Sequence, residues 1–122
     1  GLGCFTLCDI PRGTYGKYIG IRYEIERENG DYTWVINEYN LTTGKTISNK
    51  PVCYIDSINP KYGNWTRYVN CGLTDDDNNI DTFQSFDKLY YKANRDIFAG
   101  EELFTDYGIE YRNKLGIKYD YN

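Results

Sequence analysis

The residues best suited to chemistry lie in one stretch, residues 64–72, with the sequence NWTRYVNCG. Its apolar residues are typical of a buried strand, yet the polar Asn70 and Cys71 end it. Because a polar group in a core needs a hydrogen-bond partner, this pattern indicates that the Asn70 side chain is held for binding. The alternative is a strand that runs into a turn at Gly72, with Asn70 bonded to its own backbone.

Histidine is absent from all 122 residues, which restricts the possible chemistry. Ser-His-Asp catalysis, Cys-His catalysis and histidine-containing zinc sites are excluded within this segment. The four cysteines show no C-x-x-C spacing, so they do not predict a zinc site either. They are Cys4, Cys8, Cys53 and Cys71. The sequence therefore predicts no metal centre.

Length and composition indicate a single globular domain covering residues 1–122. The chain is 40% hydrophobic and 17% aromatic, which is enough to form a core without disulfides. No apolar run is long enough to span a membrane, and no signal-peptide pattern opens the chain. The absence of methionine indicates that the numbering starts inside a longer protein. The net charge of −4 argues against DNA as the main ligand and suits a basic peptide or a neutral small molecule.

Two N-x-[ST] sequons, at Asn40 and Asn64, leave open a secreted β domain with paired cysteines. Such triplets arise by chance in an asparagine-rich chain. The second also lies in a stretch expected to be buried, where a glycan would not fit. We therefore expect an intracellular protein, and a count of free thiols distinguishes the two possibilities.

The elements that must position these groups are predicted to be short strands. Apolar runs rich in β-branched and aromatic residues alternate with glycine-containing turns. The expected strands cover residues 18–21, 32–36, 51–56, 64–71, 80–86 and 89–93. The last two form a predicted hairpin around Asp87 and Lys88. Only residues 109–115 are expected to be helical, with a stop at Gly116, so the sequence predicts a mainly β domain with one short helix.

Four segments of the chain resemble SET-domain lysine methyltransferases, and within them the PR-domain branch. In the family's order these segments are Gly1-Leu2-Gly3 with Phe5, Tyr18-Ile19-Gly20, residues 64–71 and residues 101–108. The Gly-x-Gly element is unspecific by itself, whereas the Asn-Trp-x-Arg-Tyr-Val-Asn-Cys block is highly specific to PR domains. The similarity covers nearly the whole chain. It is greatest to the histone H3 methyltransferases of this branch that carry zinc fingers.

The resemblance implies a SET/PR fold of small twisted antiparallel sheets with one short helix. In that fold the C-terminal segment threads past the Asn70 strand in a knot-like arrangement. S-adenosylmethionine would bind on one side, and the substrate lysine would enter from the other through a narrow channel.

The resemblance also implies a role for each residue that matches a family motif. The cofactor-binding residues would be Gly1, Leu2, Gly3, Asn70, Cys71 and Tyr107. Tyr107 matches the catalytic tyrosine, and Tyr18 and Tyr91 match the other two tyrosines of the lysine pocket. Asn29, Tyr32 and Trp34 are expected to contact the substrate. Trp34 and Trp65 are also expected to be core residues.

Methyl transfer from a sulfonium to an amine needs no metal, no histidine and no covalent intermediate, so a histidine-free chain is compatible with it. The amine must be neutral to attack, and a desolvating aromatic channel beside a cation lowers the pKa of a lysine. Tyrosine rings attract the cation, while their oxygens accept polarised C–H donors from the methyl group. Most of the acceleration would come from alignment and electrostatic preorganisation. Each tyrosine taken singly is ordinary core material; their joint placement in family motifs favours a pocket.

The sequence therefore predicts a nuclear chromatin regulator that methylates protein lysines with S-adenosylmethionine. Histone H3 is the expected substrate, with the lysine at its fourth position favoured. The expected partners are the H3 tail or another lysine-rich peptide and the nucleosome, with no direct DNA binding by this domain and no membrane. The alternative is a catalytically weak or inactive PR domain that binds protein partners in a transcription regulator. The presence of Tyr107 with Asn70 and Cys71 favours the enzyme, and cofactor-dependent thermal stabilisation distinguishes the two.

Overall fold

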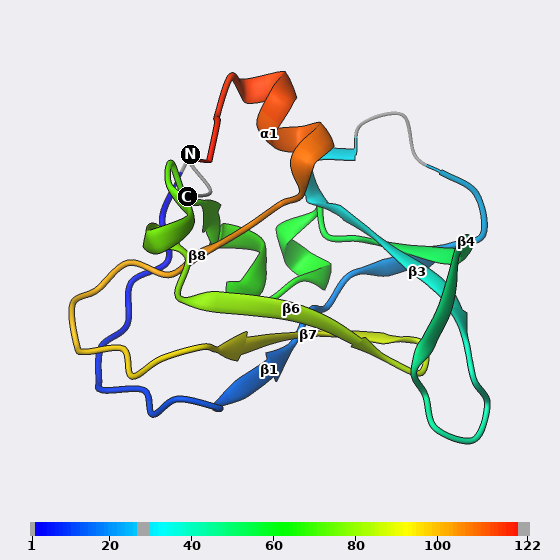
Figure 1. Ribbon diagram of the computed structural model, residues 1–122, viewed down its shortest axis with the longest axis horizontal. Helices are drawn as coiled ribbons and strands as arrows, with labels where there is room; N and C mark the ends of the chain where they lie inside the picture. The colour runs from blue at the N-terminus through cyan, green and yellow to red at the C-terminus, as the bar shows by residue number, and fades with distance from the viewer. Residues whose placement is uncertain (1, 27–29, 120–122) are drawn as a thin grey trace. The chain divides into compact units, whose positions relative to one another are not determined.

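The computed structural model describes residues 2–26 and 30–119 of the chain (Figure 1). These residues form two compact units, each assembled from stretches that are distant in the sequence. The first unit contains residues 2–15, 68–82 and 92–119, and the second contains residues 16–26, 30–67 and 83–91. Gly1 and Asn29, two of the predicted site residues, lie outside the described residues. Within the described residues, no helix combines the length and apolar character needed to cross a bilayer.

Most of the regular structure consists of short strands in two sheets. The three-stranded sheet has the order β2-β4-β3, and the five-stranded sheet has the order β1-β7-β6-β8-β5. The first sheet contains β2 (Ile21–Tyr23), β3 (Thr33–Tyr39) and β4 (Thr46–Asp56). The second contains β1 (Tyr15–Lys17), β5 (Asn70–Cys71), β6 (Ile80–Ser85), β7 (Lys88–Ala93) and β8 (Phe104–Thr105). Short 3-10 turns are η1 (Gly30–Tyr32), η2 (Pro60–Tyr62), η3 (Trp65–Tyr68) and η4 (Asp75–Asp77).

The three-stranded sheet belongs entirely to the second unit and provides much of its core. The sequence of β3, TWVINEY, is rich in the β-branched and aromatic residues that favour strands. It pairs antiparallel with β4, with Trp34 opposite Ile55, and its register shifts on both sides of Asn37. Such shifts mark bulges, which bend a strand. Ile36 and Ile55 are buried on this sheet. The predicted strand at residues 51–56 is confirmed as part of β4, and the one at residues 32–36 is confirmed from Thr33 onward, because Tyr32 belongs to η1.

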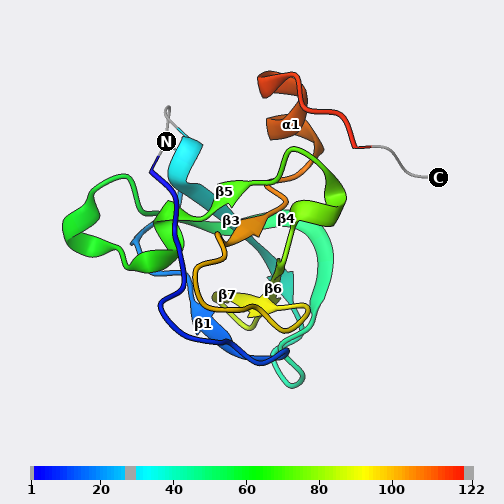
Figure 2. The same cartoon turned by 90° about the vertical axis from the view of Figure 1, so that its left-hand side faces the viewer.

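In the first unit, the short strand β8 lies between β5 and β6 and runs parallel to both (Figure 2). Its register pairs Asn70 with Phe104 and Cys71 with Thr105. The C-terminal part of the chain therefore passes directly beside the Asn70 strand before it reaches Tyr107. The predicted mainly β fold class is confirmed, although these two pairings are parallel where antiparallel sheets were expected.

The predicted helix is confirmed as α1 (Ile109–Leu115), which ends at Gly116. Gly116 has φ 73° and ψ 19°, the left-handed conformation that glycine adopts at little cost. Its N–H donates to the carbonyls of Arg112 and Asn113, which satisfies part of the open helix end. The predicted hairpin is also present as β6 and β7, with its turn at Phe86 and Asp87, one residue earlier than expected.

The predicted strand over residues 64–69 is wrong, because Trp65–Tyr68 form the 3-10 turn η3 and only Asn70–Cys71 are a strand. The cause is local: the Oδ1 atom of Asn64 accepts a hydrogen bond from the N–H of Thr66 at 3.1 Å. Such a bond offers the backbone an alternative to a sheet ladder, and it curls the chain into a turn. The aromatic residues of this stretch fit a strand pattern in the sequence, but in the structure they belong to a turn.

The predicted strand at residues 18–21 is also wrong, because residues 18–20 connect β1 to β2. Gly20 lies there against the backbone of Asp56, the residue that pairs with Ile21. A Cβ atom at position 20 would lie 2.5 Å from the carbonyl oxygen of Asp56, closer than any real contact. The connection therefore requires glycine.

We expect Gly20→Ala to lower the free energy of unfolding by about 2 kcal/mol or more, because only backbone atoms are available to move. Urea denaturation measures this change. Gly30→Ala is the matched control, since a Cβ atom there would have no neighbour within 4 Å. Equal stability of the two variants would contradict the assigned backbone contact.

Candidate active site

Two of the predicted lysine-pocket tyrosines meet in the second unit. Tyr18 and Tyr91 are 3% and 2% exposed, and their rings stack with centroids 5.6 Å apart. Trp34 packs edge-on against both rings, at 6.4 Å from Tyr18 and 6.2 Å from Tyr91. Trp65 adds a fourth ring, 6.3 Å from Tyr91. The structure thus brings together an aromatic cluster, defined as Tyr18, Trp34, Trp65 and Tyr91.

The elements around the aromatic cluster fix the orientation of each ring. The N–H of Tyr18 donates to the carbonyl of Leu89 at 2.8 Å, and Tyr91 lies two residues further along the same strand, β7. The indole N–H of Trp34 donates to the hydroxyl of Tyr91 at 2.9 Å. The hydroxyl of Tyr18 donates to the carbonyl of Tyr32 at 2.6 Å. These bonds hold the polar ends of the rings in a defined arrangement.

Burial raises the pKa of the Tyr18 hydroxyl above its ordinary value. The hydroxyl therefore stays protonated at neutral pH and keeps its hydrogen bond to the Tyr32 carbonyl. Because this hydroxyl is uncharged, the electrostatic character of the cluster comes from its aromatic rings. The faces of these rings carry the partial negative charge of the quadrupole.

Arg67 lies against the ring of Tyr32, and the sequence analysis assigned no role to it. It is 9% exposed, and its Nε and Nη2 atoms donate to the carbonyls of Ser57 and Ile58 at 2.8 and 2.9 Å. Its guanidinium carbon lies 4.6 Å from the centre of the Tyr32 ring. Arg67 therefore ties η3 to the chain after β4 and supports the residue whose carbonyl binds Tyr18.

Trp65 was expected to be a core residue, and this is wrong, because 40% of it is exposed. Its ring covers Gly16, where a Cβ atom would lie 2.7 Å from the indole. Trp34 is half-buried, so it combines a packing role with some exposure. An indole that is only partly covered is available to contact a ligand as well as its neighbours.

In the first unit, the parallel pairing of β5 with β8 places Tyr107 close to Asn70. Tyr107 follows β8 by two residues, and its hydroxyl donates to the carbonyl of Val69, the residue before Asn70. Its ring packs edge-on against Tyr111 with centroids 4.7 Å apart. Asn70 and Tyr107, two of the residues predicted to act on the cofactor, are therefore neighbours.

Cys71 is the next residue of β5, and its Sγ atom lies 3.5 Å from the hydroxyl of Tyr119. That hydroxyl donates to the carbonyl of Gly72 at 2.9 Å and accepts from the Nδ2 atom of Asn78 at 2.9 Å. Burial raises the pKa of Tyr119, which keeps the hydroxyl protonated. Arg112 covers the ring at 4.1 Å from its centre. The C-terminal segment is thus fastened to the strand that carries Asn70 and Cys71.

The N-terminal segment joins the same unit beside Glu102. The N–H of Leu103 donates to the carbonyl of Cys4 at 2.8 Å, and Phe5 forms a bridge with Glu102. A Cβ atom at Gly3 would lie 2.8 Å from the Phe5 ring and 2.9 Å from Oε2 of Glu102. Leu2 is 77% exposed, so the described part of the predicted cofactor loop leaves an apolar side chain uncovered.

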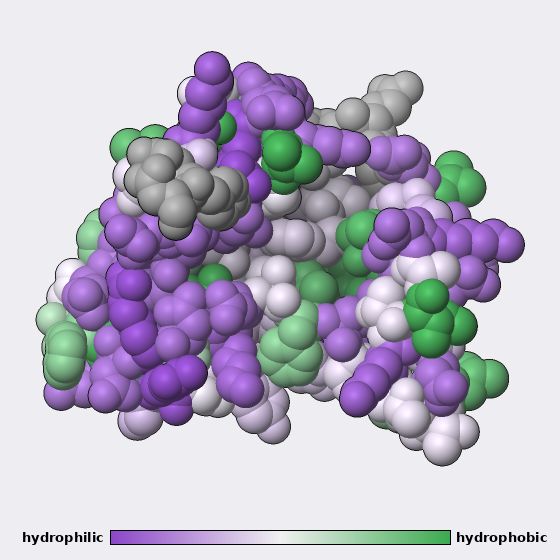
Figure 3. Space-filling view, viewed as in Figure 1, coloured by the Kyte–Doolittle hydropathy of each residue, from purple (hydrophilic) through white to green (hydrophobic). Residues whose placement is uncertain are grey.

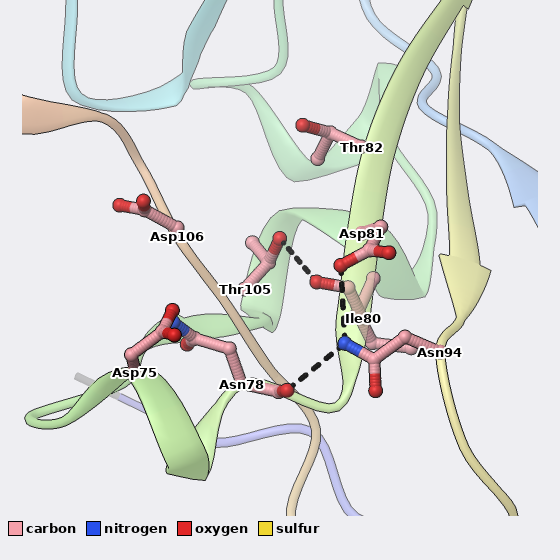
Figure 4. A pocket seen from close by; sticks show the side chains of 8 residues that line it. All are labelled: Asp75, Asn78, Ile80, Asp81, Thr82, Asn94, Thr105 and Asp106. Carbon is pink, nitrogen blue, oxygen red and sulfur yellow. Dashed lines mark hydrogen bonds between the residues drawn. The ribbon is translucent and has the colours of Figure 1, made fainter. Parts of the chain in front are cut away.

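A cavity of about 520 Å³ in the first unit contains none of the predicted site residues (Figure 4). Its walls are polar, and the lining residues are Asp75, Asn78, Ile80, Asp81, Thr82, Asn94, Thr105 and Asp106. Asn94 donates to Asp81 and to the carbonyl of Asn78, and Thr105 donates to the carbonyl of Ile80. The surface over β8 and the adjoining part of this unit is mainly hydrophilic in the space-filling view (Figure 3). These internal bonds account for the polar walls without a ligand.

Tyr18 also borders a second cavity, of about 230 Å³, in the second unit. The basic side chains of Lys17, Arg22 and Lys88 line it as well. Asp87 pairs with Arg22 at 3.7 Å and with Lys88 at 3.3 Å, which offsets part of this positive charge.

The described residues include no group of histidine, cysteine or acidic side chains arranged to hold a metal ion. All four cysteines lie within the described residues, and none of them forms a disulfide. The alternative with paired cysteines predicts fewer than four free thiols, which a thiol count tests.

The structure assembles the predicted site residues in two groups. One is the aromatic cluster with Tyr32, in the second unit. The other, in the first unit, contains Gly3, Asn70, Cys71 and Tyr107. Sequence reasoning missed Arg67 and Glu102, although both lie within the motifs that carry the resemblance.

Comparison with known proteins identifies the family. A family model for the PR domain of PR domain zinc finger protein 2 matches residues 1–118. The chain therefore belongs to the PR-domain family. It is 35% identical over 121 residues to the human protein named histone-lysine N-methyltransferase PRDM7. It is 30% identical over 118 residues to the Caenorhabditis elegans protein named histone-lysine N-methyltransferase set-17.

The matches cover nearly all of this chain but only part of each relative. They span 97% and 94% of this chain, against 23% of PRDM7 and 39% of set-17. Among solved structures, the methyltransferase domain of human PR domain-containing protein 2 superposes with a TM-score of 0.62 at 23% identity. That match covers 97% of this chain and 67% of the other. The SET domain of the RIZ1 tumour suppressor (PRDM2) gives a TM-score of 0.64 at 27% identity, covering 86% of this chain and 60% of the other.

Proposed function

We propose that this chain is the catalytic domain of an S-adenosylmethionine-dependent protein-lysine N-methyltransferase that acts on histone H3. The observation that carries the proposal is the hydrogen bond from Tyr107 to the Val69 carbonyl, directly beside Asn70. It is supported by two relatives that are named histone-lysine N-methyltransferases. The lysine at the fourth position of H3 is the favoured target, on the resemblance alone. The domain would belong to a nuclear chromatin regulator.

The residues around Asn70 fit the amino-acid end of the cofactor. Gly3 lies against the Phe5 ring and the Glu102 carboxylate, where a Cβ atom would clash, so this segment packs directly beside the partner of Asn70. Asn70 supplies an amide with both donor and acceptor atoms, as the ammonium and carboxylate of an amino acid require. When bound, the cofactor supplies an electrophilic methyl group on a sulfonium.

The aromatic cluster would receive the substrate side chain. Its rings attract a cationic lysine through their faces and also remove it from water. Desolvation lowers the pKa of the lysine, which favours the neutral amine needed for attack. The bonds from Trp34 to Tyr91 and from Tyr18 to Tyr32 would hold the rings in place for this task.

Tyr107 would align the reacting groups through its hydroxyl. A hydroxyl that donates to the Val69 carbonyl turns its oxygen lone pairs toward other donors. Those lone pairs can accept polarised C–H groups or the amine, so alignment and electrostatic complementarity would account for the rate.

The H3 tail, another lysine-rich peptide and the nucleosome are the proposed partners. The net charge of −4 supports a basic peptide, because opposite charges steer association. The same charge disfavours direct DNA binding by this domain.

Binding of S-adenosylhomocysteine, measured by thermal shift, tests the cofactor site. At a hundredfold excess over its Kd we expect the ligand to raise the Tm by about 10 °C. Asn70→Ala should lose most of this shift. Asn49→Ala is the control and should retain it, because Asn49 is an exposed asparagine on β4.

Methyl transfer to H3 then distinguishes an enzyme from an inactive PR domain that only binds partners. The absence of any shift with the wild-type protein would overturn the proposed function.

A further inference from the structure

Glu102 is in direct contact with the residue predicted to hold the cofactor. The Nδ2 atom of Asn70 donates to Oε2 of Glu102 at 3.0 Å. The backbone of Glu102 is fixed as well, because its carbonyl accepts from Nδ2 of Asn79 at 2.9 Å and it bridges to Phe5. The backbone of Glu102 is thus fixed from two segments, and its carboxylate is bound by Asn70.

The chemistry of this contact fixes the orientation of the Asn70 amide. An ionised carboxylate only accepts hydrogen bonds, so the amide nitrogen of Asn70 must face it. The Oδ1 atom of Asn70 is then turned away from Glu102. An amide oxygen accepts hydrogen bonds, and the ammonium group of an amino acid donates them. Without Glu102, the amide could turn over with little change of shape and present its nitrogen instead.

Two further observations place the carboxylate at the cofactor segment. A Cβ atom added to Gly3 would lie 2.9 Å from Oε2 of Glu102. The carboxylate therefore packs against the backbone of the predicted cofactor loop. The pKa of the nearby Cys4 thiol is raised by burial and, in addition, by the negative charge of Glu102. A negative charge at this place attracts a cationic ligand and repels an anionic one.

We propose that Glu102 is a positioning residue that orients the Asn70 amide so that Oδ1 accepts a hydrogen bond from the ammonium group of the cofactor. This inference rests on the proposed function. It adds to it a residue that determines how the site recognises the ammonium group of the ligand. Glu102 acts through Asn70, and its effect should depend on the presence of the ammonium group.

The test compares two ligands by isothermal titration calorimetry. One is S-adenosylhomocysteine, and the other is its deaminated analogue, in which hydrogen replaces the ammonium group. In the Glu102→Gln variant the new amide can donate to Oδ1 of Asn70 and turn the amide over. We expect S-adenosylhomocysteine to bind about tenfold more weakly to this variant, and the deaminated analogue to change less than about twofold.

The control is Glu101→Gln, which makes the same change of charge at the neighbouring exposed residue and keeps an acceptor for the N–H of Phe98. It should leave both affinities unchanged. Glu102→Asp, which keeps an acceptor-only carboxylate, should retain a preference for the ligand that carries the ammonium group, and this comparison remains available if Glu102→Gln does not fold.

Three results would overturn the assignment. Equal weakening of both ligands by Glu102→Gln would show a merely structural role. Unchanged binding of both ligands would show that Glu102 has no role in cofactor binding. Failure of the wild-type protein to bind S-adenosylhomocysteine would overturn the proposed function, and the role of Glu102 with it.

Discussion

Replacing Tyr107 by phenylalanine is expected to reduce methyl transfer to histone H3 by about 100-fold or more. The substitution removes one hydroxyl, which donates to the Val69 carbonyl beside Asn70, and keeps the ring that packs against Tyr111. If alignment and polar contacts supply most of the rate, loss of that single oxygen removes a contact made at the reacting centre. The measurement is the rate of transfer of a labelled methyl group at saturating cofactor.

The fold of this variant should be nearly unchanged, because one neutral hydrogen bond contributes only about 1 kcal/mol. Thermal unfolding and S-adenosylhomocysteine binding check that the protein is intact. Tyr62→Phe is the matched control, since Tyr62 is an exposed tyrosine of η2 outside both groups of site residues. Methyl transfer by Tyr107→Phe at the wild-type rate would contradict the role assigned to the Tyr107 hydroxyl.

Replacing Arg67 by leucine is expected to lower the free energy of unfolding by about 3 kcal/mol. The guanidinium is buried, and it satisfies the carbonyls of Ser57 and Ile58 while it covers the ring of Tyr32. Leucine would leave both carbonyls without these bonds. Ser57 is fully buried, and an unsatisfied buried acceptor costs more than the average hydrogen bond contributes. Urea denaturation measures the loss.

Arg95→Leu is the control for this prediction. Arg95 also donates to a backbone carbonyl, that of Asp76 at 2.9 Å, but it is exposed, so water can replace it. We expect a change of less than about 0.5 kcal/mol for this variant. Similar losses in the two variants would contradict the role assigned to the buried guanidinium.

Local patterns in the sequence predicted the elements whose structure is decided locally. Most of the β-branched and aromatic run at residues 32–36 lies in β3, which begins at Thr33, and the glycine at position 116 ends the helix as expected. The strand prediction for residues 64–69 was wrong for a local reason as well, since the hydrogen bond from the N–H of Thr66 to the Asn64 side chain competes with strand formation. An Asn two residues before a Thr was the signal that could have indicated the turn.

The pairing of β8 could not be read from the sequence, because its strand is only Phe104–Thr105 and its partners are distant in the chain. That pairing is what places Tyr107 beside Asn70, so the approach of the two residues was available only through the family resemblance. The exposure of Trp65 was missed for a related reason. A large aromatic residue is usually buried, and only the structure shows that it covers Gly16 from outside.

Glu102 illustrates a further limit of sequence reasoning. Glu101 and Glu102 are adjacent and chemically identical, and nothing in the pattern distinguishes them. In the structure, Glu101 accepts from the N–H of Phe98, while Glu102 accepts from the Asn70 amide. The different direction of the two side chains, set by the bridge between Phe5 and Glu102, separates a turn residue from a candidate site residue.

The most direct test of the central claim is mass spectrometry of recombinant H3, free and in nucleosomes, after incubation with the wild-type domain and S-adenosylmethionine. We predict methylation of a lysine in the H3 tail, with the fourth-position lysine modified first. Unmodified histones, together with no binding of the cofactor, would contradict the account and leave a PR domain that serves as a binding module.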